Sequence, residues 1–96
     1  MQYWLVVEDE KINLLQSDLP VNLNPERKKY IKAIVYINSG SIRVRNTGIP
    51  ATSTTGIIYN EHTSFVLEGI LSLQQCSIQA ISSNVEVYVE YLTLRS

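Results

Sequence analysis

The chain has few of the residues that carry chemistry. Its 96 residues include one cysteine and one histidine. A structural zinc site needs three or four Cys, His or carboxylate ligands that converge, so these counts argue against a metal site. Cys76 has no second cysteine with which to form an intrachain disulfide, and we interpret it as a small buried apolar residue. We therefore expect no metal and no cofactor.

The same scarcity argues against catalysis. His62 would have to serve as the sole imidazole base, and no aspartate follows Asp18 in the chain. The chain therefore has few side chains from which a nucleophilic triad could form. Glu86 and Glu90 would lie about 13 Å apart on one strand face at about 3.3 Å per residue, a wider spacing than glycosidases use. Residues 52–55 have no adjacent lysine and do not form a phosphate-binding loop. We predict that the chain is not an enzyme and has no catalytic residues.

Excess charge and long apolar runs are also lacking. Eight lysines and arginines nearly balance nine acidic residues, which gives a net charge of −1. Such a balance supplies no long-range field for phosphates or anionic lipids, so we predict no nucleic acid and no membrane as partners. No apolar stretch approaches the roughly 20 residues that span a bilayer, and residues 1–7 lack the basic flank of a secretion signal. We expect synthesis in the cytoplasm.

What the sequence does contain is alternation of apolar and other residues, which is typical of β-strands. Residues 84–94 place three valines and a tyrosine on one face, and two glutamates, a tyrosine and a leucine on the other. Residues 29–37 alternate in the same way and end in a turn at 38–40, so we predict that residues 41–45 form the hairpin partner. Ile42 and Val44 of that partner should point inward.

Shorter strands are predicted at residues 2–7, 57–59, 64–67 and 76–81, with an acidic turn at 8–11. Residues 68–75 fit either a short helical turn or an irregular strand. About seven or eight short strands indicate an all-β fold, a single antiparallel β-sandwich or a jelly-roll-like barrel. The length fits one hydrophobic core, so we expect one domain over 1–96, with a less regular N-terminal strand and extended arm at 1–28 and a sandwich body at 29–94.

Several tyrosines lie on strand faces where a monomer usually carries Lys, Thr or Ser. Tyrosine is favoured in protein interfaces, and a core of this size without disulfides gains stability from burial against neighbouring subunits. We therefore predict a homo-oligomer, while the alternative is that the domain's own sheets and loops cover both faces. The candidate interface residues, from these faces and from the polar loop 46–56, are Tyr30, Ile34, Tyr36, Tyr88, Leu92, Asn46, Thr52 and Thr54.

A second function remains open on the same residues. Trp4 or the tyrosines beside the polar loop would form a stacking platform in a carbohydrate-binding or other ligand-binding β-sandwich. Trp4 falls in a predicted strand, however, where it also fits a core or interface anchor.

The order of segments in the last two-thirds of the chain resembles a known pattern. Residues 40–56 (GSIRVRNTGIPATSTTG) run from a strand into a polar excursion, and an apolar strand, the turn VLEG at 66–69 and the strand VEVYV at 85–89 follow. Over about residues 35–92 this arrangement resembles small β-rich virion proteins of tailed bacteriophages. The resemblance brings no catalytic residues with it.

The resemblance implies a structural role in the virion. The leading expectation is a capsid decoration or cement subunit, and the alternative is a head-to-tail or tail adaptor or ring protein. The implied partners are further copies of the chain and other virion proteins such as the major capsid protein. The implied location is the virion, after synthesis in the host bacterial cytoplasm.

Overall fold

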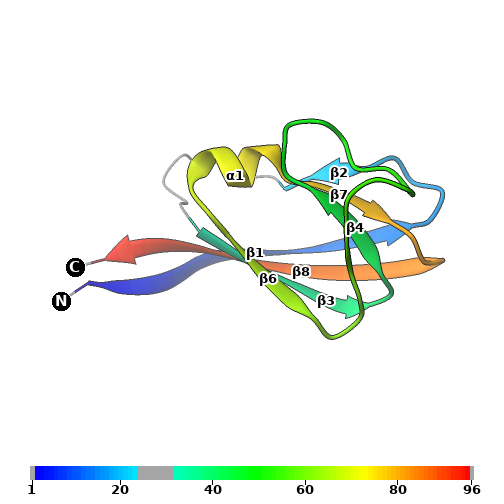
Figure 1. The fold of residues 1–96 in the computed structure, drawn as a ribbon. Helices are drawn as coiled ribbons and strands as arrows, with labels where there is room; N and C mark the ends of the chain where they lie inside the picture. The colour runs from blue at the N-terminus through cyan, green and yellow to red at the C-terminus, as the bar shows by residue number, and fades with distance from the viewer. Residues whose placement is uncertain (1, 24–31, 96) are drawn as a thin grey trace.

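The structure, a computed structural model, describes residues 2–23 and 32–95. Two antiparallel four-stranded sheets form a β-sandwich, which confirms the predicted all-β fold (Figure 1). Sheet A has the strand order β1-β8-β3-β6, and sheet B has the order β2-β7-β4-β5. The elements are β1 (Tyr3–Leu15), β2 (Val21–Asn22), β3 (Lys32–Ser39), β4 (Ile42–Arg45), β5 (Ile57–Tyr59), β6 (Ser64–Glu68), α1 (Ile70–Gln75), β7 (Ser77–Ala80) and β8 (Asn84–Arg95).

The core lies between the sheets and is built from the alternating apolar residues. Residues 32–37 of β3 and 85–91 of β8 alternate between half-buried and buried side chains, as their sequences predict. Each fully buried Val, Ile or Leu side chain contributes about 1.5–3 kcal/mol. The fully buried core side chains include Val35, Ile37, Ile42, Leu73, Cys76, Ile78, Val87, Val89 and Tyr91.

The predicted acidic turn at 8–11 is wrong, because β1 continues through it to Leu15. The pairing register with β8 shifts at Val7, which forms a β-bulge that adds one residue to β1. Beyond the bulge, β8 supplies partners for the acids of β1; the Tyr91 hydroxyl, for example, donates a hydrogen bond to Glu10. A run of acidic residues therefore remains in a strand.

The predicted hairpin of 29–37 with 41–45 is also wrong. β3 pairs with β8 and β6 in sheet A, whereas β4 pairs with β7 and β5 in sheet B. Both strands bury one apolar face, and placing them in opposite sheets brings those faces together in the core. The chain changes sheets at Gly40, whose φ of 78° suits a residue without a side chain. Residues 29–31 of the predicted strand lie outside the described residues.

Residues 68–75 contain α1, which follows β6 and precedes β7. Leu73 is fully buried in the core, and Leu71 on the same helix is 64% exposed. The helix therefore lies along the margin of the sandwich where the chain passes from sheet A to sheet B (Figure 1). Within the described residues, no helix has the length and apolar character needed to cross a membrane.

The two longest strands extend beyond the body of the sandwich. β3 begins opposite Leu92, so residues 93–95 of β8 pair only with residues 3–5 of β1 among the described residues. These paired ends form a two-stranded ribbon that carries both ends of the chain (Figure 1).

Candidate protein interface

The chain's own β4–β5 loop covers part of the outer face of sheet B, over β4 and β7. The Arg43 guanidinium on β4 donates hydrogen bonds to the backbone carbonyls of Ser53, at 3.0 Å, and Gly56, at 2.8 Å. The Ala51 amide donates to the Ser77 hydroxyl on β7 at 2.9 Å, and both residues are buried. The loop is thus fastened to the sheet from which it emerges.

Three predicted interface residues lie in this loop. Asn46, Thr52 and Thr54 are exposed. The Thr54 amide donates a hydrogen bond to the Thr52 hydroxyl at 3.2 Å, so part of their polar capacity is used within the loop. They lie over sheet B and are separated from the predicted residues on β3 and β8, which belong to sheet A.

The side chains of sheet A that point away from sheet B form a second surface, which we call the outer face of sheet A. Strand pairing places them in rows across β1, β8, β3 and β6. Val66 on β6 is 50% exposed and Trp4 on β1 is 41% exposed. The outer face consists of Trp4, Val6, Asp9, Lys11, Asn13, Lys32, Ile34, Tyr36, Ser64, Val66, Glu68, Glu86, Tyr88, Glu90, Leu92 and Leu94.

Four predicted interface residues come together on this face: Ile34, Tyr36, Tyr88 and Leu92. The first three are half-buried, but Leu92 is only 7% exposed. It therefore supports the face from below and offers little area for contact. Tyr30, the other predicted residue, lies outside the described residues.

A cation–π contact accounts for the burial of Leu92. The Lys32 ammonium on β3 lies 4.6 Å from the centroid of the Trp4 ring on β1. Since β8 runs between β3 and β1, this contact passes over β8 at Leu92, which is the residue paired with Lys32. Such contacts contribute about 0.5–1 kcal/mol at exposed sites. Trp4 is thus a surface residue and not part of the core.

Two tyrosines form the aromatic part of the outer face. Tyr36 and Tyr88 are directly paired across β3 and β8, with ring centroids 6.3 Å apart and ring planes at 28°. The Tyr88 hydroxyl donates to the Asp9 carboxylate, and this bond raises the pKa of Tyr88 to about 12. Desolvation and a hydrogen bond to Glu90 raise the pKa of Tyr36. Both phenols are therefore neutral donors held in place by carboxylates.

Tyr88→Phe should change the alkaline stability of the protein. The folded pKa of Tyr88 lies above its ordinary value of 10.0, so its contribution is fully present below pH 10 and is lost as the pH rises towards 12. We expect the difference in Tm between wild type and Tyr88→Phe to shrink across that interval. Tyr3→Phe, at an exposed tyrosine of β1, is the control. A wild type and a Tyr88→Phe variant that lose stability in parallel up to pH 12 would contradict the assignment.

The residues that sequence reasoning missed on this face are Val6, Val66 and Leu94. Each lies in a predicted strand, and alternation alone shows which neighbours share its face. Alternation does not show which strands pair or in which register, however, so it does not join β1 and β6 to the tyrosines of β3 and β8.

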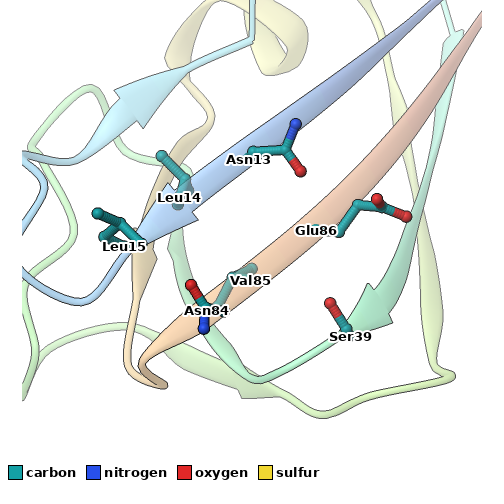
Figure 2. Close-up of a pocket in the computed structure, with 7 residues that line it drawn as sticks. All are labelled: Asn13, Leu14, Leu15, Ser39, Asn84, Val85 and Glu86. Carbon is teal, nitrogen blue, oxygen red and sulfur yellow. The ribbon is translucent and has the colours of Figure 1, made fainter.

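A hollow of about 220 Å³ lies where β1 and β3 end and β8 begins (Figure 2). Its polar lining comes from Asn13, Ser39, Asn84 and Glu86, and Glu86 is the single ionisable residue among those that line it. The Glu86 carboxylate is bound by the Asn38 amide at 3.1 Å and by the Lys11 ammonium at 3.7 Å. It therefore has structural partners, and Glu90 is bound separately by Tyr36.

The remaining chemically active residues are isolated. Burial raises the pKa of Cys76 to about 12, so its sulfur is a thiol at neutral pH. His62 is exposed in a turn with a φ of 67°, beside Glu61 at 3.5 Å. Over residues 2–23 and 32–95, no three His, Cys, Asp or Glu side chains gather in a group that could hold a metal ion.

The outer face of sheet A combines exposed apolar and aromatic side chains with ion pairs and further acidic residues, a mixture that also occurs in protein contact surfaces. Comparison with known proteins adds no family assignment. No family model matches the chain, and neither the curated proteins nor the solved structures contain a match.

Proposed function

We propose that the chain is a non-enzymatic structural subunit of a tailed-phage particle. Its leading role is that of a capsid decoration or cement protein that binds neighbouring virion proteins through the outer face of sheet A. The observation that carries this proposal is the contrast between the two sheets. In sheet B the β4–β5 loop is fastened over β4 and β7, and the exposed Ile57 and Ile58 lie on the short edge strand β5. Sheet A presents exposed Trp4, Val6, Val66 and Leu94 on three of its four strands.

The arrangement of charge supports a protein partner. Ile34 and Val66 are paired neighbours on β3 and the edge strand β6, with Val66 midway along β6. Ion pairs flank them: Lys32 with Glu68 at 3.7 Å on one side, and Lys11 with Glu86 at 3.7 Å on the other. An apolar centre excludes water, while a charged rim gives orientation and specificity. The tyrosines supply rigid area with polar ends that a partner's backbone can meet.

The carbohydrate-binding alternative is less well supported by the geometry. Sugar recognition on this face would require a ring that is open for stacking. The Lys32 ammonium already lies over one side of the Trp4 ring. The hollow with amide and carboxylate groups at the far end of β1 and β8 is lined by no aromatic residue.

Val66→Lys tests the proposal. Particles from a phage with the gene deleted would be mixed with purified chain and sedimented, with bound chain measured by mass spectrometry. A lysine within the contact surface leaves a charge without a partner, which typically costs 2–5 kcal/mol, so we expect binding to weaken by about a hundredfold. Val66 is half exposed on an edge strand, so the free energy of unfolding should change little.

Leu19→Lys is the matched control, because Leu19 is 84% exposed in the segment between β1 and β2. It should bind particles like the wild type. A chain that never sediments with particles, or a Val66→Lys variant that binds like Leu19→Lys, would refute the proposed surface. If gene deletion prevents complete particles from forming, the adaptor role replaces decoration. A Trp4 fluorescence change with a glycan, without particle binding, would favour the carbohydrate reading.

A further inference from the structure

Within residues 2–23 and 32–95, the longest unpaired strand edge belongs to β1. Among the described residues β1 pairs only with β8, and it is 13 residues long. The other edge strands are β6 with five residues, β5 with three and β2 with two. An unpaired edge offers a row of backbone amides and carbonyls to any strand that approaches it, and natural proteins shorten, charge or cover such edges.

Charge protects only the middle of this edge. Residues 8–11 are Glu-Asp-Glu-Lys, and the bulge at Val7 separates them from the ribbon. Residues 3–7 are Tyr-Trp-Leu-Val-Val and carry no charge. The side chains of residues 3–6 are 40–52% exposed. Residues 12–15 also carry no charge, but Ile12 is half-buried and Leu14 is buried, so the continuous exposed apolar part of the edge lies at residues 3–6.

We propose that residues 3–7 pair with the same segment of a second copy, antiparallel and around a two-fold axis at Leu5. This inference rests on the proposed function, since it supplies the self-contact of an assembling subunit. A two-fold contact uses the same patch on both copies. Trp4 of each copy would lie opposite Val6 of the other, and Leu5 would face Leu5.

Charge is the argument for a second copy as the occupant. Two identical segments of residues 3–7 meet without like-charge repulsion because neither carries a charged residue. The acidic run of each copy then lies outside the paired segment, at opposite ends of it. A register centred three or four residues further along, at Glu8 or Asp9, would bring acidic residues of the two copies opposite one another, which is destabilising. The charges of β1 therefore disfavour a pairing centred on its acidic run and favour one centred in its apolar start.

This pairing also extends the outer face of sheet A. Opposed residues of antiparallel strands share a face, so Trp4 and Val6 of both copies lie on the same side. Two sheets A become one sheet, with the two candidate contact surfaces side by side. The paired segment is about 17 Å long at about 3.4 Å per residue. A contact of this length buries less surface area than a standard stable interface, which buries about 1,600 Å². We therefore expect a reversible dimer whose population depends on concentration.

A charge exchange at Leu5 tests the pairing and its register. Leu5→Lys and Leu5→Glu each place like charges opposite one another across the axis, whereas an equimolar mixture places opposite charges there. In sedimentation equilibrium of the full chain, we expect the wild type to dimerise, each variant alone to dimerise at least about tenfold more weakly, and the mixture to recover the dimer. Leu5 is 40% exposed, so both variants should fold.

Leu71→Lys is the control, since Leu71 is an exposed leucine of α1 away from the β1 edge. It should dimerise like the wild type. A wild type that stays monomeric over the whole concentration range, or single Leu5 variants that dimerise normally, would overturn the pairing. A mixture that stays monomeric would overturn the axis at Leu5.

The two proposals fail separately. If Leu5→Lys loses the dimer while Val66→Lys binds particles normally, the proposed contact surface is wrong and the strand pairing stands. If Leu5→Lys keeps the dimer while Val66→Lys loses particle binding, the strand pairing is wrong and the proposed function stands.

Discussion

Gly40→Ala should lower the free energy of unfolding by about 3 kcal/mol, one of the two largest single effects we expect. A left-handed backbone costs a residue with a side chain about 1–2 kcal/mol, and Gly40 has a φ of 78°. A Cβ at this position would also lie 2.5 Å from the Asn84 carbonyl oxygen and 2.8 Å from Val85 Cγ2. Overpacking of this kind adds about 1–3 kcal/mol. The affected turn is the one at which the chain leaves sheet A for sheet B.

Gly48→Ala separates the two causes. Gly48 has a φ of 84°, but its nearest neighbour beyond the adjacent residues is the Gln75 side chain at 3.6 Å, an ordinary contact. Its replacement should cost about 1 kcal/mol, from the backbone alone. Urea denaturation with an unchanged m-value measures both variants. Equal losses at the two glycines would show that the close approach to β8 contributes nothing.

Leu73→Ala should cost about 3 kcal/mol and should also release α1. Leu73 is fully buried between the sheets, and truncation of such a leucine leaves a cavity whose cost is about 2–5 kcal/mol. The helix has six residues, too few to be stable without tertiary contacts, and it has no side-chain N-cap. We expect faster amide hydrogen exchange across residues 70–75 together with the loss in free energy of unfolding.

Leu71→Ala provides the comparison within the same helix. Leu71 is exposed, so its truncation removes little buried area and should change the free energy of unfolding by less than about 0.5 kcal/mol. If the two alanine variants have similar stability, α1 is not held by the core contact of Leu73.

Local pattern predicts the strands better than it predicts their partners. The alternation in β3, β4 and β8 places the correct side chains in the core, because period-two burial depends only on neighbouring residues. The predicted hairpin of β3 with β4 is wrong, because a turn with glycine has the same kind of sequence whether the chain returns to its own sheet or crosses to the opposite one. The predicted turn at residues 8–11 is wrong for a related reason. Tyr91, whose hydroxyl donates a hydrogen bond to Glu10, lies 81 residues further along the chain, so local sequence does not show this partner.

The candidate interface shows the same division. Ile34, Tyr36 and Tyr88 could be predicted, because each is an apolar or aromatic side chain opposite a buried face. The position of the β4–β5 loop over sheet B could not be predicted. It depends on hydrogen bonds from Arg43 of β4 to backbone carbonyls of the loop that follows the same strand. Nor could the burial of Leu92 be predicted, because Lys32 and Trp4 meet over it from strands that the sequence does not show to be in one sheet.

The position of β8 has a consequence for how the chain acquires its structure during synthesis. β8 is an inner strand of sheet A and joins β1 to β3, yet it is the last strand to be made. Until it emerges from the ribosome, Tyr3–Leu15 has no partner in sheet A, and β3 has only β6. Contacts between residues so distant in sequence form slowly, because a long loop must close first. Sheet A is therefore completed after translation of β8, and the apolar start of β1 remains exposed for most of that time.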